Sequence, residues 1–334
     1  MTFHKTSRAP TITDVAEVLH ISRATVSRAF SRPDLLSEQT VKSVHAAAAK
    51  LGYRPNQTAR ALSTGRHGNI AIVVPDIANP FFPPLIRAAQ IAADGGGFSL
   101  FLADSDEDAA REHTLLEKLL LQADGFVVVS SRMADEQLQQ LAKRHPMVLV
   151  NRDTPGIPRV LIDTTQGIEE AVTHLAGLGH KRLVYVGGPA ASWSHQQRRL
   201  AVKQATTRQK IALEQVSAER PTFEAGKVLA PAVLKTKATA AITFDDFVAH
   251  GLMAGLTDAS VQVPQDFSVI GCDDVLGAST YPALTSVSAR CIEAGRMAVE
   301  MLLQILQTGK SSDQRCILDT RLVIRATTAS SPAK

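Results

Sequence analysis

Two arginines near the N-terminus are suited to reading DNA bases. Arg23 and Arg28 lie within the segment Ser22–Arg28, and a guanidinium group can donate two parallel hydrogen bonds to O6 and N7 of guanine. Such side chains need an element that carries them into the major groove. Ile12–Ala16 followed by Ser22–Arg28 is typical of two short helices joined by a tight turn, which is the helix-turn-helix arrangement.

The apolar residues of this segment support two packed helices. They recur at helical spacing, as Val15, Ala16 and Leu19 in the first helix and Thr25, Val26 and Ala29 in the second. Ser22 is suited to cap the second helix, because its hydroxyl can accept a hydrogen bond from a free backbone N–H. A third amphipathic helix is expected at Glu38–Leu51, closed by Gly52. Residues 57–63 could add one or two turns, which we expect to order only on DNA.

Charge is distributed unevenly along the chain. Residues 1–66 contain ten Lys or Arg and four Asp or Glu, a net charge of +6, whereas the remainder contains 26 and 28, a net charge of −2. A short basic module on a near-neutral body is typical of phosphate binding. The alternative is that these residues form a solvent-exposed basic surface that binds nothing, but the helix-turn-helix pattern favours DNA binding.

From Asn69 onward, apolar β-type runs alternate with helical stretches. The expected strands are Ile70–Val74, Phe98–Leu102, Gly125–Val129, Pro146–Val150, Val160–Ile162, Leu183–Val186, Ala240–Thr243 and Ser268–Gly271. This alternation predicts βαβ units, and therefore parallel sheets covered by helices on both faces. A chain of 334 residues is long enough for two such lobes beside the helical module.

Polar and aromatic residues follow several of these strands. In open α/β sheets ligands sit beyond the carboxyl ends of the strands, so the loops after Val74, Gly187, Phe244 and Gly271 should line one cleft. These loops carry Asp76, Phe82, Trp193, Arg198, Asp245, Asp246, Asp273 and Asp274. Such groups fit a polyol or a nucleoside-like molecule. Loop capping by the two last carboxylates and lobe packing by the tryptophan stay open as alternatives.

Other function classes lack their signatures. Neither Gly95–Gly97 nor Gly187–Pro189 forms a nucleotide-binding loop, and the chain has no Gly-x-Ser-x-Gly elbow, so we expect neither catalysis nor a cofactor. The three cysteines are far apart and lack metal spacing, which indicates reduced thiols. No apolar run of about 18 residues is present, and the polar start is unlike a signal peptide. We expect a cytoplasmic protein without membrane contact, and no exported sugar-binding protein.

Seven motifs together resemble those of the lactose-repressor (LacI/GalR) family of bacterial transcription regulators. In order along the chain they are Thr-Val-Ser-Arg (25–28), Leu-Gly-Tyr-Arg-Pro-Asn (51–56), Ala-Arg-Ala-Leu (59–62), Val-Pro-Asp-Ile-Ala-Asn-Pro-Phe-Phe (74–82), Leu-Gly-His (178–180), Val-Pro-Gln-Asp-Phe-Ser-Val-Ile-Gly (263–271) and Pro-Ala-Leu-Thr-Ser-Val (282–287). The resemblance runs from about Thr11 to Ala326. It implies a transcriptional regulator, most often a repressor, that binds operator DNA and responds to a sugar, a sugar derivative or a nucleoside.

The resemblance also implies three parts of the chain. Residues 1–55 would form the all-α helix-turn-helix headpiece, residues 56–67 a hinge helix and linker, and residues 68–331 an α/β core like a two-lobed periplasmic binding protein. The N-lobe would contain about 68–163 plus 290–318, and the C-lobe about 164–289 plus 319–331.

The DNA-binding residues follow from the same resemblance. They are Thr11, Ser22, Arg23, Ala24, Thr25, Ser27, Arg28, Ser37, Thr40, Tyr53, Asn56, Ala59 and Leu62. Arg23 and Arg28 would read bases, although a phosphate contact from Arg23 remains an alternative. Leu62 would wedge into the minor groove, with packing against the core as its alternative. His20 stands where relatives have glycine, which raises the question of a positive φ in the turn.

The predicted effector-binding residues are Asp76, Phe82 and Trp193 from the strand-end loops, together with Arg198, Asp246 and Asp273, which the resemblance implies. Arg199 is an alternative to Arg198. Relatives have Asn-Asp where this chain has Asp245-Asp246, so an acceptor replaces an amide donor and a different effector is plausible. A homodimer on a pseudo-palindromic operator is expected. No leucine heptad follows Arg325, so a tetramer is not expected.

Overall fold

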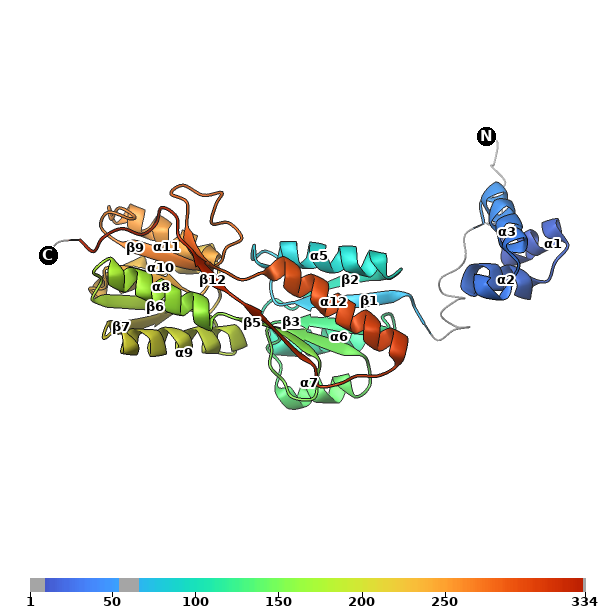
Figure 1. The fold of residues 1–334 in the computed structure, drawn as a ribbon, viewed down its shortest axis with the longest axis horizontal. Coiled ribbons are helices and arrows are strands. Elements are labelled where there is room, and N and C mark those ends of the chain that lie inside the picture. Colours follow the sequence, from blue (N-terminus) through green and yellow to red (C-terminus); the bar gives the residue numbers. More distant parts are fainter. Residues whose placement is uncertain (1–9, 54–65, 333–334) are drawn as a thin grey trace, which may run out of the picture. The chain divides into compact units, whose positions relative to one another are not determined.

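In this computed structural model, residues 10–53 and 66–332 are described (Figure 1). The chain divides into two compact units between His67 and Gly68. We describe the N-terminal unit, the headpiece, and the C-terminal unit, the core, separately.

The headpiece is built from helices α1 (Ile12–Leu19), α2 (Arg23–Ser31) and α3 (Glu38–Leu51), with a 3-10 turn η1 at Pro33–Leu35. The predicted helix-turn-helix and the predicted bounds of the third helix are confirmed. Ser22 caps α2, because its Oγ accepts a hydrogen bond from Thr25 N at 3.0 Å. Gly52 ends α3 with φ of 71°. His20 ends α1 with φ of 50°, so the turn does require a left-handed residue.

A small apolar core holds the three helices together. It contains Val15, Ala16, Val26, Ala29, Val44, Ala47 and Ala48. The small side chains let the helices approach closely. Phe30 covers one side of this core, where its ring meets those of His45 and Tyr53 edge-on at 4.7 and 5.9 Å between centroids. This packing leaves the outer side of α2 exposed.

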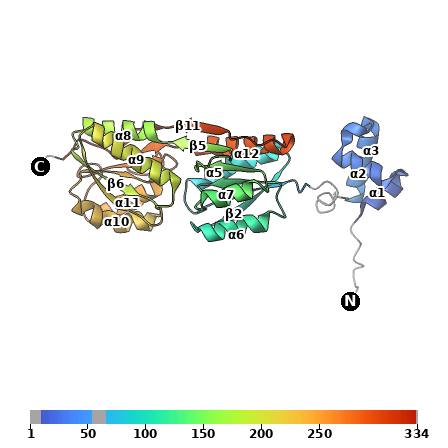
Figure 2. The same cartoon turned by 90° about the horizontal axis from the view of Figure 1, so that it is seen from below.

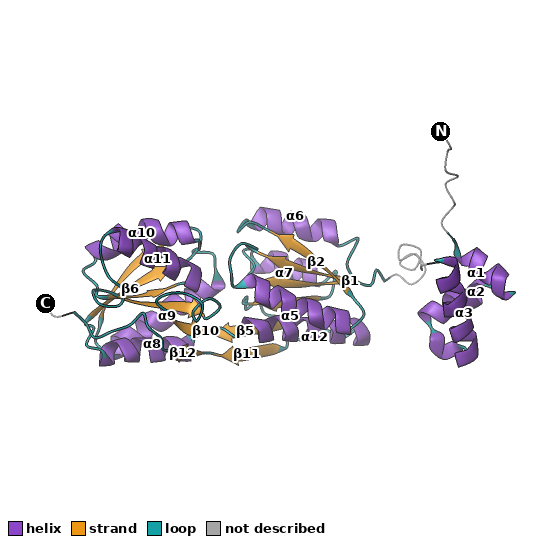
Figure 3. Ribbon diagram, turned by 90° about the horizontal axis from the view of Figure 1, so that it is seen from above, coloured by secondary structure: helices purple, strands orange, loops and turns teal. Residues whose placement is uncertain are grey.

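The first lobe of the core, the N-lobe, has a six-stranded sheet of order β11-β5-β4-β3-β1-β2. Its elements are β1 (Asn69–Val74), α5 (Phe82–Gly95), β2 (Ser99–Asp104), α6 (Ala109–Leu119), β3 (Gly125–Val129), α7 (Asp135–Ala142), β4 (Met147–Val150), β5 (Arg159–Asp163), α12 (Cys291–Thr308) and β11 (Arg315–Asp319). Alternate residues of β1 face opposite layers, as the two-residue period of a strand requires. Ile70 and Ile72 pack toward α5 and α12, whereas Ala71 and Val73 pack toward α6 and α7. Figure 3 shows these two pairs of helices on opposite faces of the N-lobe sheet.

The second lobe, the C-lobe, repeats this plan with the strand order β12-β10-β9-β8-β6-β7. Its elements are α8 (Thr165–Gly177), β6 (Arg182–Gly187), α9 (Trp193–Arg208), β7 (Ala212–Ser217), α10 (Phe223–Lys235), β8 (Ala240–Thr243), α11 (Asp246–Asp258), β9 (Ser268–Asp273), β10 (Thr285–Ser288) and β12 (Arg321–Val323). Helices α8 and α9 cover one face, and α10 and α11 cover the other (Figure 2).

The chain passes between the lobes at three places, after β5, after β10 and between β11 and β12. The last crossing inserts β11 parallel to β5 in one sheet and β12 antiparallel to β10 in the other. Parallel sheets were predicted correctly for the rest of the core. Strands β7, β10, β11 and β12 were not among the expected strands.

Helices α10 and α11 pack with their backbones in close contact at glycine positions. A Cβ atom on Gly251 of α11 would lie 1.9 Å from the carbonyl oxygen of Phe223, and one on Gly226 of α10 would lie 2.3 Å from that of Val248. Both neighbours are backbone atoms that cannot rotate away. The two helices can therefore pack this way only without side chains at these positions.

Substitution of Gly251 by alanine should destabilise the core. We expect Gly251→Ala to lower the free energy of unfolding by about 1–3 kcal/mol, since overpacking forces the helices apart, as measured by urea denaturation. Gly177→Ala, near the end of α8, is the matched control, because a Cβ there meets nothing within 4 Å. Equal stability of the two variants would contradict the close packing.

Candidate functional site

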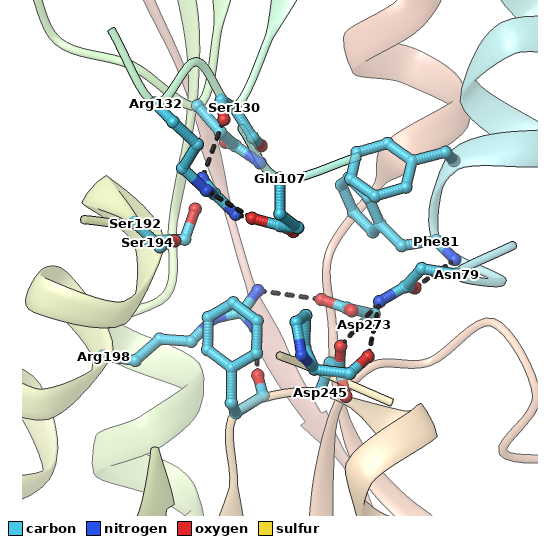
Figure 4. A pocket seen from close by; sticks show the side chains of 14 residues that line it. Asn79, Phe81, Glu107, Ser130, Arg132, Ser192, Ser194, Arg198, Asp245 and Asp273 are labelled. Carbon is cyan, nitrogen blue, oxygen red and sulfur yellow. Dashed lines mark hydrogen bonds and ion pairs between the residues drawn. The ribbon is translucent and has the colours of Figure 1, made fainter. Parts of the chain in front are cut away.

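The carboxyl ends of the strands of both lobes meet at one pocket (Figure 4). Each lobe contributes seven lining residues: Asn79, Phe81, Phe82, Glu107, Ser130, Arg132 and Asn151 from the N-lobe, and Ser192, Ser194, Arg198, Pro221, Phe244, Asp245 and Asp273 from the C-lobe. The predicted cleft therefore exists, and it is polar, charged and partly aromatic.

Arg198 and Asp273 form a buried ion pair on the C-lobe side. The guanidinium Nη2 donates to Asp273 Oδ1 at 2.8 Å, and Nη1 donates to the backbone carbonyl of Phe244. The side chains of the pair are 5% and 6% exposed. The guanidinium carbon also lies 5.0 Å from the centroid of the Phe244 ring, within cation–π distance. Burial lowers the pKa of Arg198, but the neighbouring Asp273 outweighs this effect, so the net shift is upward and the arginine stays charged.

The N-lobe carries a second buried pair, between Arg132 and Glu107. The guanidinium donates to both carboxylate oxygens, at 2.6 and 3.0 Å, and a third hydrogen bond of 2.7 Å goes to the carbonyl oxygen of Ser130. Glu112 of α6 positions this loop from behind. It accepts hydrogen bonds from Ser131 Oγ at 2.5 Å and from the backbone N–H of Arg132 at 2.9 Å.

Asp245 and Asn79 connect the two lobes across the pocket. Asn79 Nδ2 donates to Asp245 Oδ2 at 2.9 Å, while Asp245 Oδ1 caps α11 by accepting from Val248 N at 2.8 Å. The Asn79 side-chain oxygen in turn accepts from Phe81 N at 3.0 Å. Asp245 is 2% exposed, and both of these donors to its carboxylate are uncharged N–H groups.

The buried carboxyl groups resist ionisation. Burial raises the pKa of Asp245 to about 7, and the charge of Asp273 adds to the shift. Burial likewise raises the pKa of Asp273 to about 7 against the opposing effect of Arg198. Desolvation penalises the charged form, and adjacent carboxylates penalise it further.

Aromatic rings from both lobes supply the apolar surface. Phe81 and Phe82 meet edge-on with centroids 5.1 Å apart, and Phe244 lies on the opposite lobe beside Arg198. Carboxylates and arginines bond to hydroxyl groups, while rings cover the apolar face of a sugar or a base. The lining residues therefore offer the contacts that a small polyhydroxylated molecule requires.

The structure brings Phe82, Arg198 and Asp273 together in the pocket. Arg198 rather than Arg199 is the buried arginine, since Arg199 is exposed on the outer side of α9. Of the adjacent aspartates, Asp245 lines the pocket. Asp246, which was predicted to bind the effector, is not among the lining residues.

The three predicted residues outside the lining have other surroundings. Asp246 is turned inward, where its carboxylate accepts hydrogen bonds from Ser286 Oγ at 2.5 Å and Val275 N at 3.0 Å. Asp76 accepts from Ala78 N at 2.8 Å within its own loop. Trp193 begins α9 and is half-buried, while its neighbours on either side, Ser192 and Ser194, face the pocket.

The N-lobe residues Asn79, Glu107, Ser130, Arg132 and Asn151 were missed. The last four follow the carboxyl ends of β2, β3 and β4. The rule that placed ligands after the strands would have found them if it had been applied to every expected N-lobe strand.

The headpiece presents the predicted base-reading residues to solvent. Arg23, Ala24, Ser27 and Arg28 are all exposed on α2. Several residues that were predicted to contact the DNA backbone form side-chain hydrogen bonds at the N-termini of the headpiece helices. Thr11 pairs with Asp14, Ser22 Oγ lies 2.9 Å from Thr25 Oγ1, and Ser37 Oγ lies 2.8 Å from Thr40 Oγ1. Tyr53 is half-buried against Phe30. Asn56, Ala59 and Leu62 lie outside the described residues.

Two negative findings concern only the described residues, 10–53 and 66–332. None of their helices is long and apolar enough to cross a membrane. They contain no group of three or more His, Cys, Asp or Glu side chains that could hold a metal ion.

Comparison with known proteins decides the family. The model of the bacterial regulatory proteins of the lacI family matches residues 11–56, and that of a periplasmic binding protein-like domain matches residues 172–328. The HTH-type transcriptional repressor CytR of Escherichia coli (strain K12) is 31% identical over 337 residues, which cover 98% of this chain and 99% of that protein. The chain belongs to the lacI family. It is a DNA-binding transcriptional regulator, and it is not an enzyme.

Solved structures of lacI-family proteins share the fold. The lac repressor dimer bound to operator and the anti-inducer ONPF superposes with a TM-score of 0.85 at 26% identity, covering 96% of this chain and 100% of that one. A LacI family transcriptional regulator from Enterococcus faecalis V583 with bound ribose has a TM-score of 0.71 at 28% identity, covering 78% and 99%. The likeness extends from the headpiece to both lobes.

The raised pKa of Asp245 predicts a pH-dependent stability for this lacI-family regulator. A carboxyl group whose pKa rises from 3.8 to about 7 on folding stabilises the folded state at low pH, and this stabilisation is lost as the pH rises through 7. Asp245→Asn keeps the helix cap and removes the titration. The free energy of unfolding of this variant relative to wild type should therefore increase between pH 5 and pH 8, by on the order of 2 kcal/mol.

Asp76→Asn is the control, because Asp76 is partly exposed and lies outside the pocket. Its stability difference from wild type should stay flat over the same pH range, as followed by urea denaturation. A flat difference for Asp245→Asn would show that its carboxyl group titrates normally.

Proposed function

We propose that this regulator represses transcription by binding a pseudo-palindromic operator as a homodimer, and that a small polyhydroxylated effector in the interlobe pocket changes its affinity for that operator. The observation that carries the proposal is the pocket itself, to which each lobe contributes one buried Arg–carboxylate pair. A ligand that contacts both lobes favours one arrangement of them. By linkage, operator DNA then changes the affinity for the effector by the same factor.

The known relatives support this assignment without naming the effector. CytR is named a transcriptional repressor, the lac repressor structure contains a dimer on operator DNA, and the Enterococcus faecalis regulator contains ribose. We propose that residues 1–55 bind DNA, residues 56–67 act as the hinge, and residues 68–331 bind the effector and dimerise. The cytoplasm, where the chromosome lies, is the proposed site of action.

The exposed side of α2 is proposed as the base-reading surface. Arg23 and Arg28 can bind guanine, and Ala24 can contact a thymine methyl group. Ser22, Thr25, Ser37 and Thr40, at two helix N-termini, would hold phosphates together with Thr11, Ser27, Tyr53 and Asn56. We further propose that Ala59 and Leu62 contact the operator centre, with Leu62 as the wedge.

Replacement of Arg23 tests base reading. An operator is first selected from random DNA with the full-length wild-type protein. Arg23→Ala should then weaken binding to this operator by about 10- to 100-fold, because a bidentate base contact is lost, and should weaken binding to unrelated DNA far less. Lys50→Ala, at the end of α3, serves as the control for loss of positive charge and should affect both DNAs alike. If Arg23→Ala lost the same fraction of its affinity for both DNAs, Arg23 would contact phosphate and would not read a base.

The dimer is proposed to form through the edge of the N-lobe sheet. Strand β2 lies at the edge of that sheet, and α5 packs beside it (Figure 1). Ile91 of α5 is 66% exposed and Leu102 of β2 is 42% exposed. Exposed edge strands and apolar patches are typical of surfaces that associate with another chain.

A charge on this surface should dissociate the dimer. Ile91→Glu should lower the mass measured by sedimentation toward that of a 35.8 kDa monomer, because burying an unpaired carboxylate in the interface is costly. Ile292→Glu is the matched control, since Ile292 is similarly exposed (62%) but lies on α12. A wild-type monomer would contradict the dimer, and an unchanged mass for Ile91→Glu would place the interface elsewhere.

A further inference from the structure

The charges that line the pocket do not balance. Arg132 and Arg198 face three carboxylates, those of Glu107, Asp245 and Asp273, and the lining includes neither lysine nor histidine. Above pH 7, where Asp245 and Asp273 are ionised as well, the pocket has a formal charge of −1. These charged groups are buried, and charge–charge interactions between buried groups are screened far less than on the surface.

Both arginines are already committed to carboxylates. Arg132 uses Nε and Nη2 for the bidentate pair with Glu107, and Arg198 uses Nη2 for Asp273 and Nη1 for the carbonyl oxygen of Phe244. Arg198 Nε is buried without a hydrogen-bond partner, and each Nη has a second N–H, so an anionic group on a ligand would reach a guanidinium only beside the carboxylate that this arginine already holds. The group would then either lie next to that carboxylate or displace it and leave it buried without a counter-ion, and both arrangements are strongly unfavourable.

Asp245 is the lining carboxylate that forms no ion pair with an arginine. Its two hydrogen-bond donors, the Asn79 amide and the Val248 backbone N–H, are both uncharged. Each carboxylate oxygen keeps a lone pair that can accept a further hydrogen bond. Hydroxyl and amine groups can donate to these lone pairs, whereas an anionic group can only be repelled.

We propose that the pocket accepts effectors without a negative charge and rejects their phosphorylated or carboxylated forms, with the Asp245 carboxylate as the main group that repels them. This inference rests on the proposed function, because it assigns the effector to the interlobe pocket. It narrows the effector to a neutral or amine-bearing polyhydroxylated molecule, such as a free sugar, an amino sugar or a nucleoside. Sugar phosphates, sugar acids and nucleotides are excluded.

The test compares ligands that share a skeleton and differ in charge. At about pH 8.5, where Asp245 and Asp273 are ionised, full-length protein is titrated by calorimetry with D-ribose and D-ribose 5-phosphate, with D-glucose, D-glucosamine and D-glucuronate, and with uridine and uridine 5′-monophosphate. In each set that binds, the neutral or amine form should bind at least about 100-fold more tightly than the anionic form, because bringing two negative charges together in a buried site is strongly unfavourable. Binding to the native state is checked by the rise in Tm that it produces.

Asp245→Asn then tests which group rejects the anion. It removes one negative charge with little change in size, and it should reduce the preference for the neutral form by at least about tenfold. Asp76→Asn removes the same charge outside the lining and should leave the preference unchanged. If the Asp245→Asn variant folds poorly, the comparison of neutral and anionic ligands on the wild-type protein still tests the inference.

The outcomes separate this inference from the function on which it rests. An anionic form that binds as tightly as its neutral parent would overturn the inference and leave the interlobe effector site standing. An unchanged preference in folded Asp245→Asn would overturn the role of Asp245. If no member of the panel binds, the proposed effector class fails, and the inference fails with it.

Discussion

Burial of the Arg198 guanidinium is the constraint on which the C-lobe depends. Its ion pair with Asp273 is nearly inaccessible to solvent, and breaking such a pair by removing one partner costs about 3–5 kcal/mol. To satisfy it, the first half of α9, the carboxylate that ends β9 and the backbone carbonyl that follows β8 must converge. Asp273 adopts φ of 112° to do so, a conformation that costs energy in any residue other than glycine. Three segments far apart in the sequence are thus held at one point, where Arg198, Phe244 and Asp273 line the interlobe pocket.

The two ion pairs are arranged so that each lobe satisfies its own charge. Arg132 pairs with Glu107 inside the N-lobe, and Arg198 pairs with Asp273 inside the C-lobe, so neither pair must break when the lobes separate. The links between the lobes are weaker. Arg220 and Asp106 form an ion pair that is about half exposed, which contributes little, and the Asn79 amide donates to Asp245. Lobe motion therefore changes the partners of Asp245 more than those of the arginines.

The sequence predicted elements well where local chemistry decides them. Ser37 and Gly52 bound α3 at both ends, and the uniform apolar runs of β3 and β8 have the predicted bounds. Strand β7 is half-exposed at a sheet edge, and β12 has three residues, so neither shows the apolar pattern of a buried strand. In the site, Arg198 and Asp273 were predicted, whereas Asp246 was chosen over Asp245. The correct choice depends on which of these two adjacent residues caps α11. Asp245 is the cap and faces the pocket, whereas Asp246 faces Ser286. If α11 began one residue later, the two carboxylates would exchange places.

An effector alters DNA affinity only if it binds one arrangement of the lobes more tightly than the other. The residues able to supply that difference are those whose partners lie on the opposite lobe. Asn79 meets Asp245 at 2.9 Å and the Pro221 carbonyl oxygen at 3.4 Å. A hydroxyl group that replaced Asn79 on Asp245 would remove a link between the lobes, whereas one that joined Glu107 to Asp273 would add one. Because the same carboxylate ties the lobes together and faces the ligand, the selectivity of the pocket and its conformational response both depend on Asp245.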